Sequence, residues 1–145
     1  MTATEYVVHA LGGPSVFKGR ASPTPIELRA RIKQGLPYRS LESVRERLRL
    51  SVPEAANVLH MPPRTLARRR QARKLDPDES DRLYRIARVA GQAVAVFGAE
   101  DKAATWLRRP NRALNCELPI RLLDTDVGAQ QVEDILGRIE HGIVS

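Results

Sequence analysis

Apolar residues recur at helical spacing through most of the chain after residue 40. Leu41, Val44 and Leu48 follow an i, i+3, i+7 pattern. A longer stretch ends at Gly98, and a last one spans residues 127–140. The apolar positions of these two stretches are Leu83, Ile86, Ala87, Ala90, Val94 and Phe97, and then Val132, Ile135, Leu136 and Ile139. The sequence contains no internal repeat or low-complexity segment, and the pattern predicts an all-α fold.

The first 39 residues are less regular because glycine and proline interrupt them. Residues 5–11 fit either a short strand or a short helix. Thr24-Pro25 is a typical helix start for residues 26–32, and Gly35 ends that helix. We expect this N-terminal arm, residues 1–39, to be partly disordered in the isolated chain and ordered by a second copy. The arm and the helix at residues 41–48 are therefore the expected dimerisation elements.

Clear helix-start signals follow from residue 40 onward. Ser40 is expected to cap the helix that contains Leu41. Ser51 and Glu54 have the spacing of a capping box, in which each side chain accepts from the other residue's backbone N–H. Pro62-Pro63 ends this second helix and opens the next, over residues 64–74. Asp76-Pro77-Asp78-Glu79 then gives an acidic start to the long helix.

Charge is distributed unevenly along the 145 residues, which carry a formal net charge of +7. Residues 1–40 hold six basic and two acidic groups, residues 41–75 nine and three, and residues 76–145 nine and twelve. The positive charge therefore lies in the first half and above all in a short middle segment. This asymmetry favours a polyanionic partner for one part of the chain and a different partner for the rest.

The segment from Ser51 to Lys74 has the layout of a helix-turn-helix unit, in which a second helix enters the major groove of DNA. Ala56 supplies the small residue needed where the two helices pack closely. Leu66, ten residues later, is expected to face the core, with Leu59 and Met61 beside the turn. We therefore predict double-stranded operator DNA as a partner.

The cationic residues of the second helix divide into two expected roles. Arg64 and Arg68 lie near the helix start, where an arginine can donate two hydrogen bonds to guanine. The remaining cations are expected to contact phosphates. The full set of predicted DNA-binding residues is Arg64, Thr65, Arg68, Arg69, Arg70, Arg73 and Lys74.

Three points weigh against this interpretation. His60 stands where a glycine is usual in the turn, and position 69, here an arginine, is often apolar in such units. An arginine-rich helix can also be no more than a solvated face.

Because recognition helices usually act in pairs related by a two-fold axis, DNA binding would also imply a homodimer.

The sequence offers no chemistry typical of an enzyme. Cys116 is the only cysteine, which excludes an internal disulfide, and no basic cluster accompanies it to lower its pKa. His60 has no second metal ligand at a suitable spacing, and Asp124 and Asp126 fit a helix N-cap. No glycine-rich phosphate loop is present. We expect no enzymatic activity, cofactor or metal, and the absence of a signal peptide or membrane-spanning run leads us to expect a cytoplasmic protein.

The C-terminal half contains a recognisable set of motif residues. Residues 104–114 read ATWLRRPNRAL, and Pro119, Leu122-Leu123-Asp124-Thr125, Gly128-Ala129 and residues 136–142 follow. This combination resembles the toxin-binding domain of Xre/ParS-type antitoxins. Residues 66–70 and 75–83 resemble the Xre-like helix-turn-helix domain that accompanies it. The chain departs from the family pattern at Cys116, where a glycine is usual.

The resemblance implies an antitoxin of a type II toxin–antitoxin system, with a helix-turn-helix domain over residues 40–97 and a toxin-binding domain over residues 98–145. Its implied partner is a RES-domain toxin that consumes NAD⁺, and the complex would repress its own operon. Residues 138–145 would insert near the toxin's NAD⁺ pocket. The candidate toxin-binding residues are Trp106, Asn111, Leu114, Arg138, Glu140, His141 and Ser145. For Trp106, Pro110, Asn111 and Leu114 the alternative is that these motif residues simply build the fold. The alternative is a stand-alone transcription regulator whose C-terminal half senses a ligand or dimerises.

Overall fold

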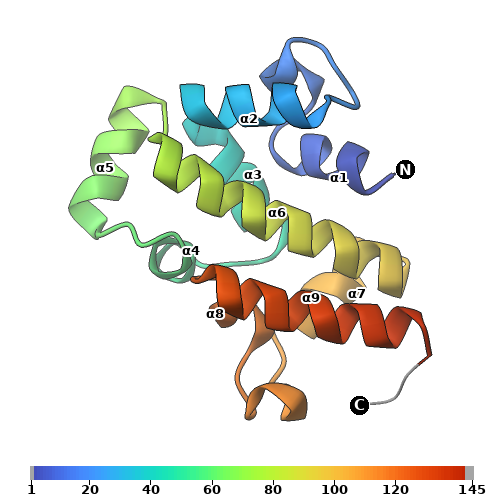
Figure 1. Cartoon of the computed structure of the whole chain (residues 1–145). Helices are drawn as coiled ribbons and strands as arrows, with labels where there is room; N and C mark the ends of the chain where they lie inside the picture. The colour runs from blue at the N-terminus through green and yellow to red at the C-terminus, as the bar shows by residue number, and fades with distance from the viewer. Residues whose placement is uncertain (1, 143–145) are drawn as a thin grey trace.

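The computed structural model describes residues 2–142, and within this range the chain is helical with no β-strand. The α-helices are α1 (Ala3–Ala10), α2 (Pro25–Gln34), α3 (Tyr38–Arg47), α4 (Val52–Val58), α5 (Pro63–Ala72), α6 (Pro77–Phe97), α7 (Glu100–Leu107), α8 (Pro119–Leu122) and α9 (Asp126–Glu140). Two 3-10 helices, η1 (Pro14–Phe17) and η2 (Arg112–Leu114), lie in the connections. The predicted all-α fold is confirmed (Figure 1).

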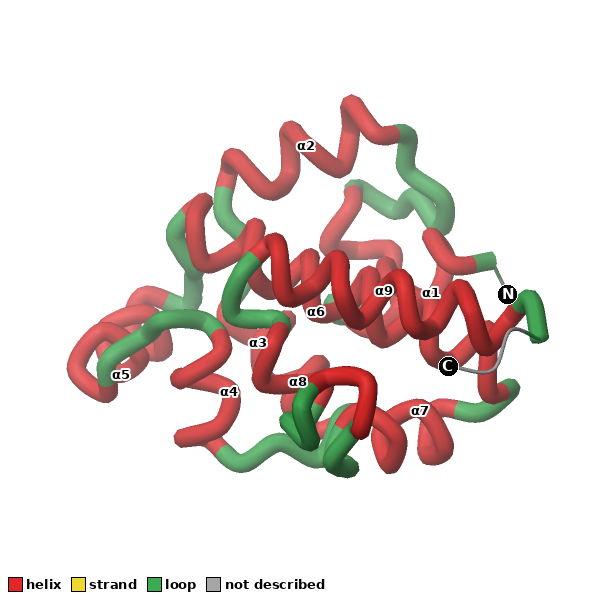
Figure 2. The backbone as a smooth tube through the Cα atoms, turned by 60° about the horizontal axis from the view of Figure 1, so that its bottom comes forward, coloured by secondary structure: helices red, strands yellow, loops and turns green. Residues whose placement is uncertain are grey.

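The long helix α6 lies at the centre of the fold, and the other helices surround it (Figure 1, Figure 2). It contacts α1, α2 and α3 from the N-terminal half and α7 and α9 from the C-terminal half. Its predicted apolar face is buried, with Leu83, Ile86 and Ala90 among the core residues. The predicted boundary after residue 97 falls at the end of α6. One cluster of buried apolar residues nevertheless includes residues on both sides of that boundary.

The N-terminal arm packs against this core within one chain. Val8, Leu11 and Leu36 are almost completely buried, and α1 lies along α6. Thr24 caps α2 in a reciprocal capping box with Glu27, as the Thr24-Pro25 pair predicts. The expectation that the arm needs a second copy to become ordered is therefore wrong. Its apolar residues already have partners in the same chain.

Helix α3 begins three residues earlier than predicted, because Ser40 does not cap it. The N-cap residue is Pro37, and Ser40 lies inside the helix with no exposed surface. The Ser40 hydroxyl instead donates a hydrogen bond to the carbonyl oxygen of Leu11. A buried acceptor in the N-terminal arm thus overrides the local cap signal.

Polar contacts also join the N-terminal helices to the C-terminal ones. Glu100, at the start of α7, accepts from the hydroxyl of Tyr6 at 2.8 Å and from Arg47 at 3.2 Å. Burial and the hydrogen bond to Glu100 raise the pKa of Tyr6 above its ordinary value. Arg108 pairs with Glu54 of α4 at 3.0 Å. These contacts join α1, α3 and α4 to α7 and the residue that follows it.

Candidate nucleic-acid and protein-binding surfaces

The connection between α4 and α5 follows the local signals in the sequence. The Ser51 side chain accepts from the backbone N–H of Glu54, and the Glu54 carboxylate accepts from that of Ser51. Pro62 is the N-cap residue of α5 and Pro63 its first residue. Helix α4 thus ends and α5 begins where the paired prolines predict. The predicted helix over residues 64–74 is shorter at its C-terminal end, because α5 stops at Ala72.

His60 occupies the turn position at which a glycine is usual, and its backbone explains that preference. Its φ of 56° lies in the left-handed region, which costs a residue with a Cβ more than it costs glycine. The His60 ring nitrogen Nε2 lies 2.7 Å from the carbonyl oxygen of Asp124. Because a carbonyl oxygen can only accept, Nε2 carries the hydrogen. This bond links the turn to the segment before α9.

The predicted packing of the two helices is partly reproduced. Ala56, Leu59 and Met61 are buried. Leu66 packs against the core but is only half-buried, and no residue of α5 reaches full burial. Helix α5 therefore extends outward from the body of the molecule (Figure 1, Figure 2).

Most of the predicted DNA-binding cations are available on the surface. Arg64, Arg68, Arg70, Arg73 and Lys74 are all exposed. Within residues 2–142, none of these five side chains lies within ion-pair distance of a carboxylate. Thr65 is half-buried, and its hydroxyl lies 3.5 Å from an Arg68 nitrogen. The exposed part of α5 thus carries a concentrated positive charge.

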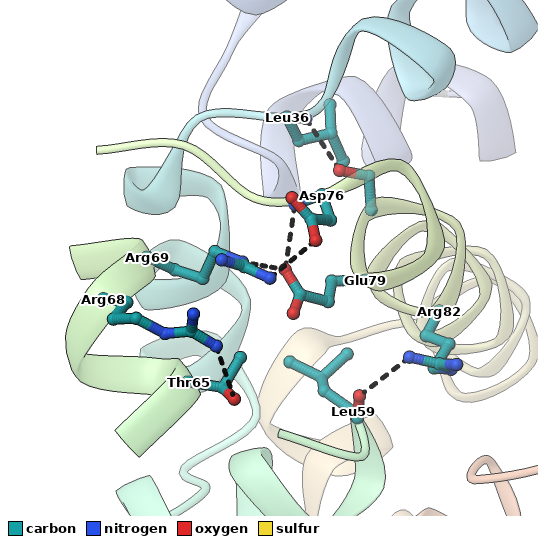
Figure 3. Close-up of polar contacts among 9 residues, drawn as sticks. Leu36, Leu59, Thr65, Arg68, Arg69, Asp76, Glu79 and Arg82 are labelled. Carbon is teal, nitrogen blue, oxygen red and sulfur yellow. Dashed lines mark hydrogen bonds and ion pairs between the residues drawn. The ribbon is translucent and has the colours of Figure 1, made fainter. Parts of the chain in front are cut away.

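Arg69 is the exception, and its predicted phosphate contact is wrong. Its side chain turns from α5 toward the first turn of α6, where it meets Glu79 and Asp76 (Figure 3). The distances are 2.8 Å to Glu79 and 2.6 Å to Asp76, and the Arg69 side chain is only 19% exposed. The hydrogen bond to Glu79 is the main cause of a raised Arg69 pKa. Arg69 therefore occupies the inward position that is often apolar in such units, and it forms ion pairs there with two carboxylates.

The C-terminal end of α5 is held by backbone contacts. Leu75 donates to the carbonyl oxygen of Leu36 at 2.8 Å, and Tyr38 donates to that of Arg73 at 3.1 Å. The backbone N–H of Leu36 donates to the Ser80 hydroxyl at 2.8 Å (Figure 3). These bonds fasten the chain after α5 to the connection between α2 and α3. They set the direction in which α5 presents its cations.

In the C-terminal half, three of the candidate toxin-binding residues help to build the fold. Trp106 is half-buried against Phe97, with ring centroids 5.5 Å apart. The Asn111 side chain accepts from the backbone N–H of Ala113 and so caps η2. Leu114 is 6% exposed, so its predicted role in direct toxin contact is wrong: its side chain lies in the core.

The loop after η2 keeps the backbone shape that glycine favours, despite the departure at Cys116. Asn115 and Cys116 have φ values of 59° and 64°, both in the left-handed region. Asn111 holds the loop by donating to the carbonyl oxygen of Glu117 and accepting from the backbone N–H of Cys116. Cys116 itself is exposed.

The motif before α9 has a clear structural reason. Thr125 is the N-cap residue, and its hydroxyl accepts from the backbone N–H of Gly128 at 3.0 Å. A Cβ at position 128 would lie 2.0 Å from the carbonyl oxygen of Leu122. Only glycine lets α8 and α9 approach this closely.

The C-terminal end of α9 is exposed. Val132, Ile135 and Leu136 are buried as predicted, whereas Ile139 on the same stripe is 37% exposed. The candidates Arg138, Glu140 and His141 are all exposed. Ser145 lies outside the described residues. The end of α9 and the exposed part of α5 lie at opposite ends of the molecule (Figure 1, Figure 2).

The described part of the chain contains neither a cluster of metal ligands nor a membrane-spanning helix. Between residues 2 and 142, no three His, Cys, Asp or Glu side chains are grouped closely enough to hold a metal ion. Within the same range, no helix has the length and apolar character needed to cross a membrane.

Together, these features define a helix-turn-helix protein with a compact helical unit on its C-terminal side. Comparison with known proteins shows that the chain belongs to the Xre antitoxin family. The antitoxin Xre-like helix-turn-helix domain matches residues 27–88, and the antitoxin Xre/MbcA/ParS C-terminal toxin-binding domain matches residues 92–142. The family resemblance seen in the sequence is confirmed.

Individual relatives agree with this assignment. The chain is 36% identical over 129 residues to an antitoxin Xre of Photorhabdus laumondii, covering 88% of this chain and 87% of that protein. It is 38% identical over 118 residues to an antitoxin Xre of Yersinia enterocolitica, covering 79% and 78%. A chain in the crystal structure of the M. tuberculosis MbcT–MbcA toxin–antitoxin complex superposes with a TM-score of 0.53 at 26% identity, covering 74% of this chain and 96% of that one. The family consists of regulatory proteins, and the chain is not an enzyme.

Proposed function

We propose that the chain binds and neutralises a RES-domain, NAD⁺-consuming toxin and represses its own operon by binding operator DNA. The observation that carries the proposal is the joining of two units in one chain. A helix-turn-helix domain and a toxin-binding domain are matched in succession over residues 27–88 and 92–142. A regulator of both a toxin and its operon needs both units.

The toxin side of the proposal rests on the exposed end of α9. Arg138, Glu140 and His141 project from the last turn, next to the exposed Ile139. Charged groups beside an apolar side chain suit the edge of a protein interface. We place this end and the residues up to Ser145 against the toxin's NAD⁺ pocket, where they would exclude the substrate. The exposed edge of Trp106 would extend the contact, in an interface of about 800 Å² on each partner.

The DNA side of the proposal rests on α5. Arg64 and Arg68 are exposed near its start and meet no carboxylate among the described residues, and there they would donate to guanine edges in the major groove. Arg70, Arg73 and Lys74 would neutralise phosphates. A homodimer would place two copies of α5 about one turn of DNA apart, on neighbouring half-sites. The positions of α5 and the α9 end at opposite ends of the molecule leave room for DNA and toxin together.

Co-expression with a RES-domain toxin encoded beside the chain's gene tests the toxin assignment. The chain should restore growth and co-purify with the toxin. Changing Arg138 and His141 together to Ala should weaken the complex by about 3- to 10-fold, because charges at the edge of an interface contribute less than central contacts. Arg121→Ala, another exposed arginine, is the matched control. Failure of the unaltered chain to rescue growth or co-purify would favour a stand-alone regulator.

Gel-shift titration on a duplex from the region upstream of the gene tests the DNA assignment. Arg68→Ala should reduce operator affinity by roughly 10- to 100-fold and relax sequence preference. Arg73→Ala should weaken binding to all duplexes alike and reduce the salt slope by about one. If both variants bind the operator as the unaltered chain does, α5 is not the reading helix.

A further inference from the structure

A hollow with a strongly basic lining lies beside the C-terminal end of α5. It is formed where α5 meets η1 and the end of α2. Its lining includes Lys18 and Arg31 from the N-terminal arm and Arg73 and Lys74 from the chain after α5. None of the residues that line it is acidic. Folding therefore gathers cations from two distant segments of the sequence around one hollow.

The walls of this hollow are held in place by hydrogen bonds. Arg31 donates through Nε to the carbonyl oxygen of Val16 and through Nη1 to that of Gly35, both at 2.6 Å. The backbone bonds between Leu75 and Leu36 and between Tyr38 and Arg73 close the other side. The Arg31 guanidinium and the backbone that carries Arg73 and Lys74 are therefore positioned before any ligand arrives.

The positive charge in the hollow is not neutralised by the described residues. Within residues 2–142, no carboxylate lies within ion-pair distance of Lys18, Arg31, Arg73 or Lys74. Glu27 is the acidic residue whose charge interacts with Lys18, and its carboxylate already forms an ion pair with Arg20 at 2.7 Å.

Arg39 adds to this unbalanced charge at the rim of the hollow. It donates to the Ser15 hydroxyl and to the carbonyl oxygen of Gly12, both at 3.1 Å. Burial lowers the pKa of Arg31, and repulsion from Arg39 lowers it further. Like charges held together without a counterion are stabilised when an anion binds between them.

We propose that this hollow binds successive phosphate groups of the DNA backbone, so that the N-terminal arm extends the DNA contact beyond α5. The proposal rests on the DNA-binding function proposed above. Arg73 and Pro37 line both this hollow and the groove between α3 and α5, so the basic surface continues from one to the other. A DNA strand with one phosphate at Arg73 would bring its next phosphates to Lys18 and Lys74. Several cations along one path suit a polyanion better than a single small anion.

The test removes Lys18 and Lys74 together, as Lys18→Gln with Lys74→Gln, in the full chain. Both side chains are exposed, and neither takes part in a hydrogen bond between the described residues, so thermal unfolding should be unchanged. The matched control is Lys102→Gln with Arg121→Gln, which removes the same charge from the exposed faces of α7 and α8. Affinity is measured over a range of salt concentrations for the upstream duplex and for an unrelated duplex.

We expect the Lys18 and Lys74 variant to bind both duplexes more weakly by the same factor. Its slope of log affinity against log salt should fall by about two, one for each lost phosphate contact, while the control keeps the slope of the unaltered chain. Sequence preference should not change, because phosphate contacts carry no base information. An equal slope in the variant and the control would overturn the hollow as a DNA contact while leaving α5 as the reading helix. Failure of the unaltered chain to bind either duplex would overturn the DNA function and this proposal together.

Discussion

Helices α5 and α9 are attached to the same core in different ways. Helix α9 buries Gly128, Ala129, Val132, Ile135 and Leu136. Helix α5 buries no residue fully, and it is held by half-buried Leu66, the ion pairs of Arg69 and the backbone bonds at its C-terminal end. Hydrophobic burial is not directional, whereas ion pairs and hydrogen bonds fix an orientation.

The apolar attachment of α9 and the polar attachment of α5 match the different surfaces that the two helices leave exposed. Burying an apolar stripe on α5 would remove surface from the cations that we propose contact DNA. With Arg69 as the polar anchor, Arg64 and Arg68 stay exposed and meet no carboxylate among the described residues. The proposed toxin contact uses only the last turn of α9, so the apolar stripe along the rest of the helix can serve the core. The comparison predicts that substitutions in α9 affect stability most and substitutions in α5 affect orientation most.

The largest effect should come from Leu136→Ala. Leu136 has no exposed surface, so truncation leaves a cavity and should lower the free energy of unfolding by about 2–5 kcal/mol. Urea denaturation followed by circular dichroism measures the change. Ile139→Ala is the control three residues later on the same stripe, 37% exposed, and should cost less than half as much. Equal losses for the two variants would contradict the burial of the α9 stripe.

Gly128→Ala should rank second, with a loss of about 1–3 kcal/mol in the free energy of unfolding. The new Cβ would lie 2.0 Å from the Leu122 carbonyl oxygen and would push α8 and α9 apart. Gly137→Ala on the same helix meets nothing within 4 Å and should be neutral or stabilising. Thermal unfolding of both variants provides the comparison, and a stabilised Gly128→Ala would mean that the two helices are not in close contact.

Glu79→Gln tests the polar anchoring of α5. Loss of the carboxylate leaves Arg69 with Asp76 as its one acidic partner among the described residues, and should cost about 1–2 kcal/mol of stability. Hydrogen exchange should speed up at the backbone amides of α5 and stay unchanged in α9. Asp78→Asn, which removes an exposed acid from the same turn of α6, is the control. Unchanged exchange in α5 would show that the ion pair does not hold the helix.

The smallest effect concerns Glu54, which connects α4 to α7 through Arg108. The Ser51 backbone N–H lowers the pKa of Glu54 below 4.5, and Arg108 lowers it further. A lowered folded-state pKa means that the stabilisation is complete above the unfolded-state pKa and is lost as pH falls through the folded-state value. Glu54→Gln should therefore cost about 0.5–1 kcal/mol at neutral pH.

Denaturation at a series of pH values checks this sign. The difference between Glu54→Gln and the unaltered chain should shrink as the pH is lowered below 4.5. Glu46→Gln, on the exposed surface of α3, is the control for the loss of a glutamate elsewhere on the surface. A difference that grows in acid would contradict the assigned pKa direction.

Several features of the fold and the candidate sites follow from the sequence because their causes are local. The capping box of Ser51 and Glu54, the paired prolines before α5 and the apolar stripes of α6 and α9 each act within a few residues. The concentration of arginine on α5 is likewise visible in the sequence. The family resemblance is also readable there, because its motifs are short runs of neighbouring residues.

Other features depend on residues far apart in the chain, and only the tertiary structure decides them. Ser40 is a buried donor because Leu11 brings a carbonyl oxygen to it, and the N-terminal arm is ordered because α6 covers its apolar residues. Arg69 turns inward because the start of α6 places two carboxylates beside it. A one-dimensional pattern determines which residues can form a helix or carry a charge. Which of those charges are neutralised and which stay free depends on the neighbours that folding brings to them.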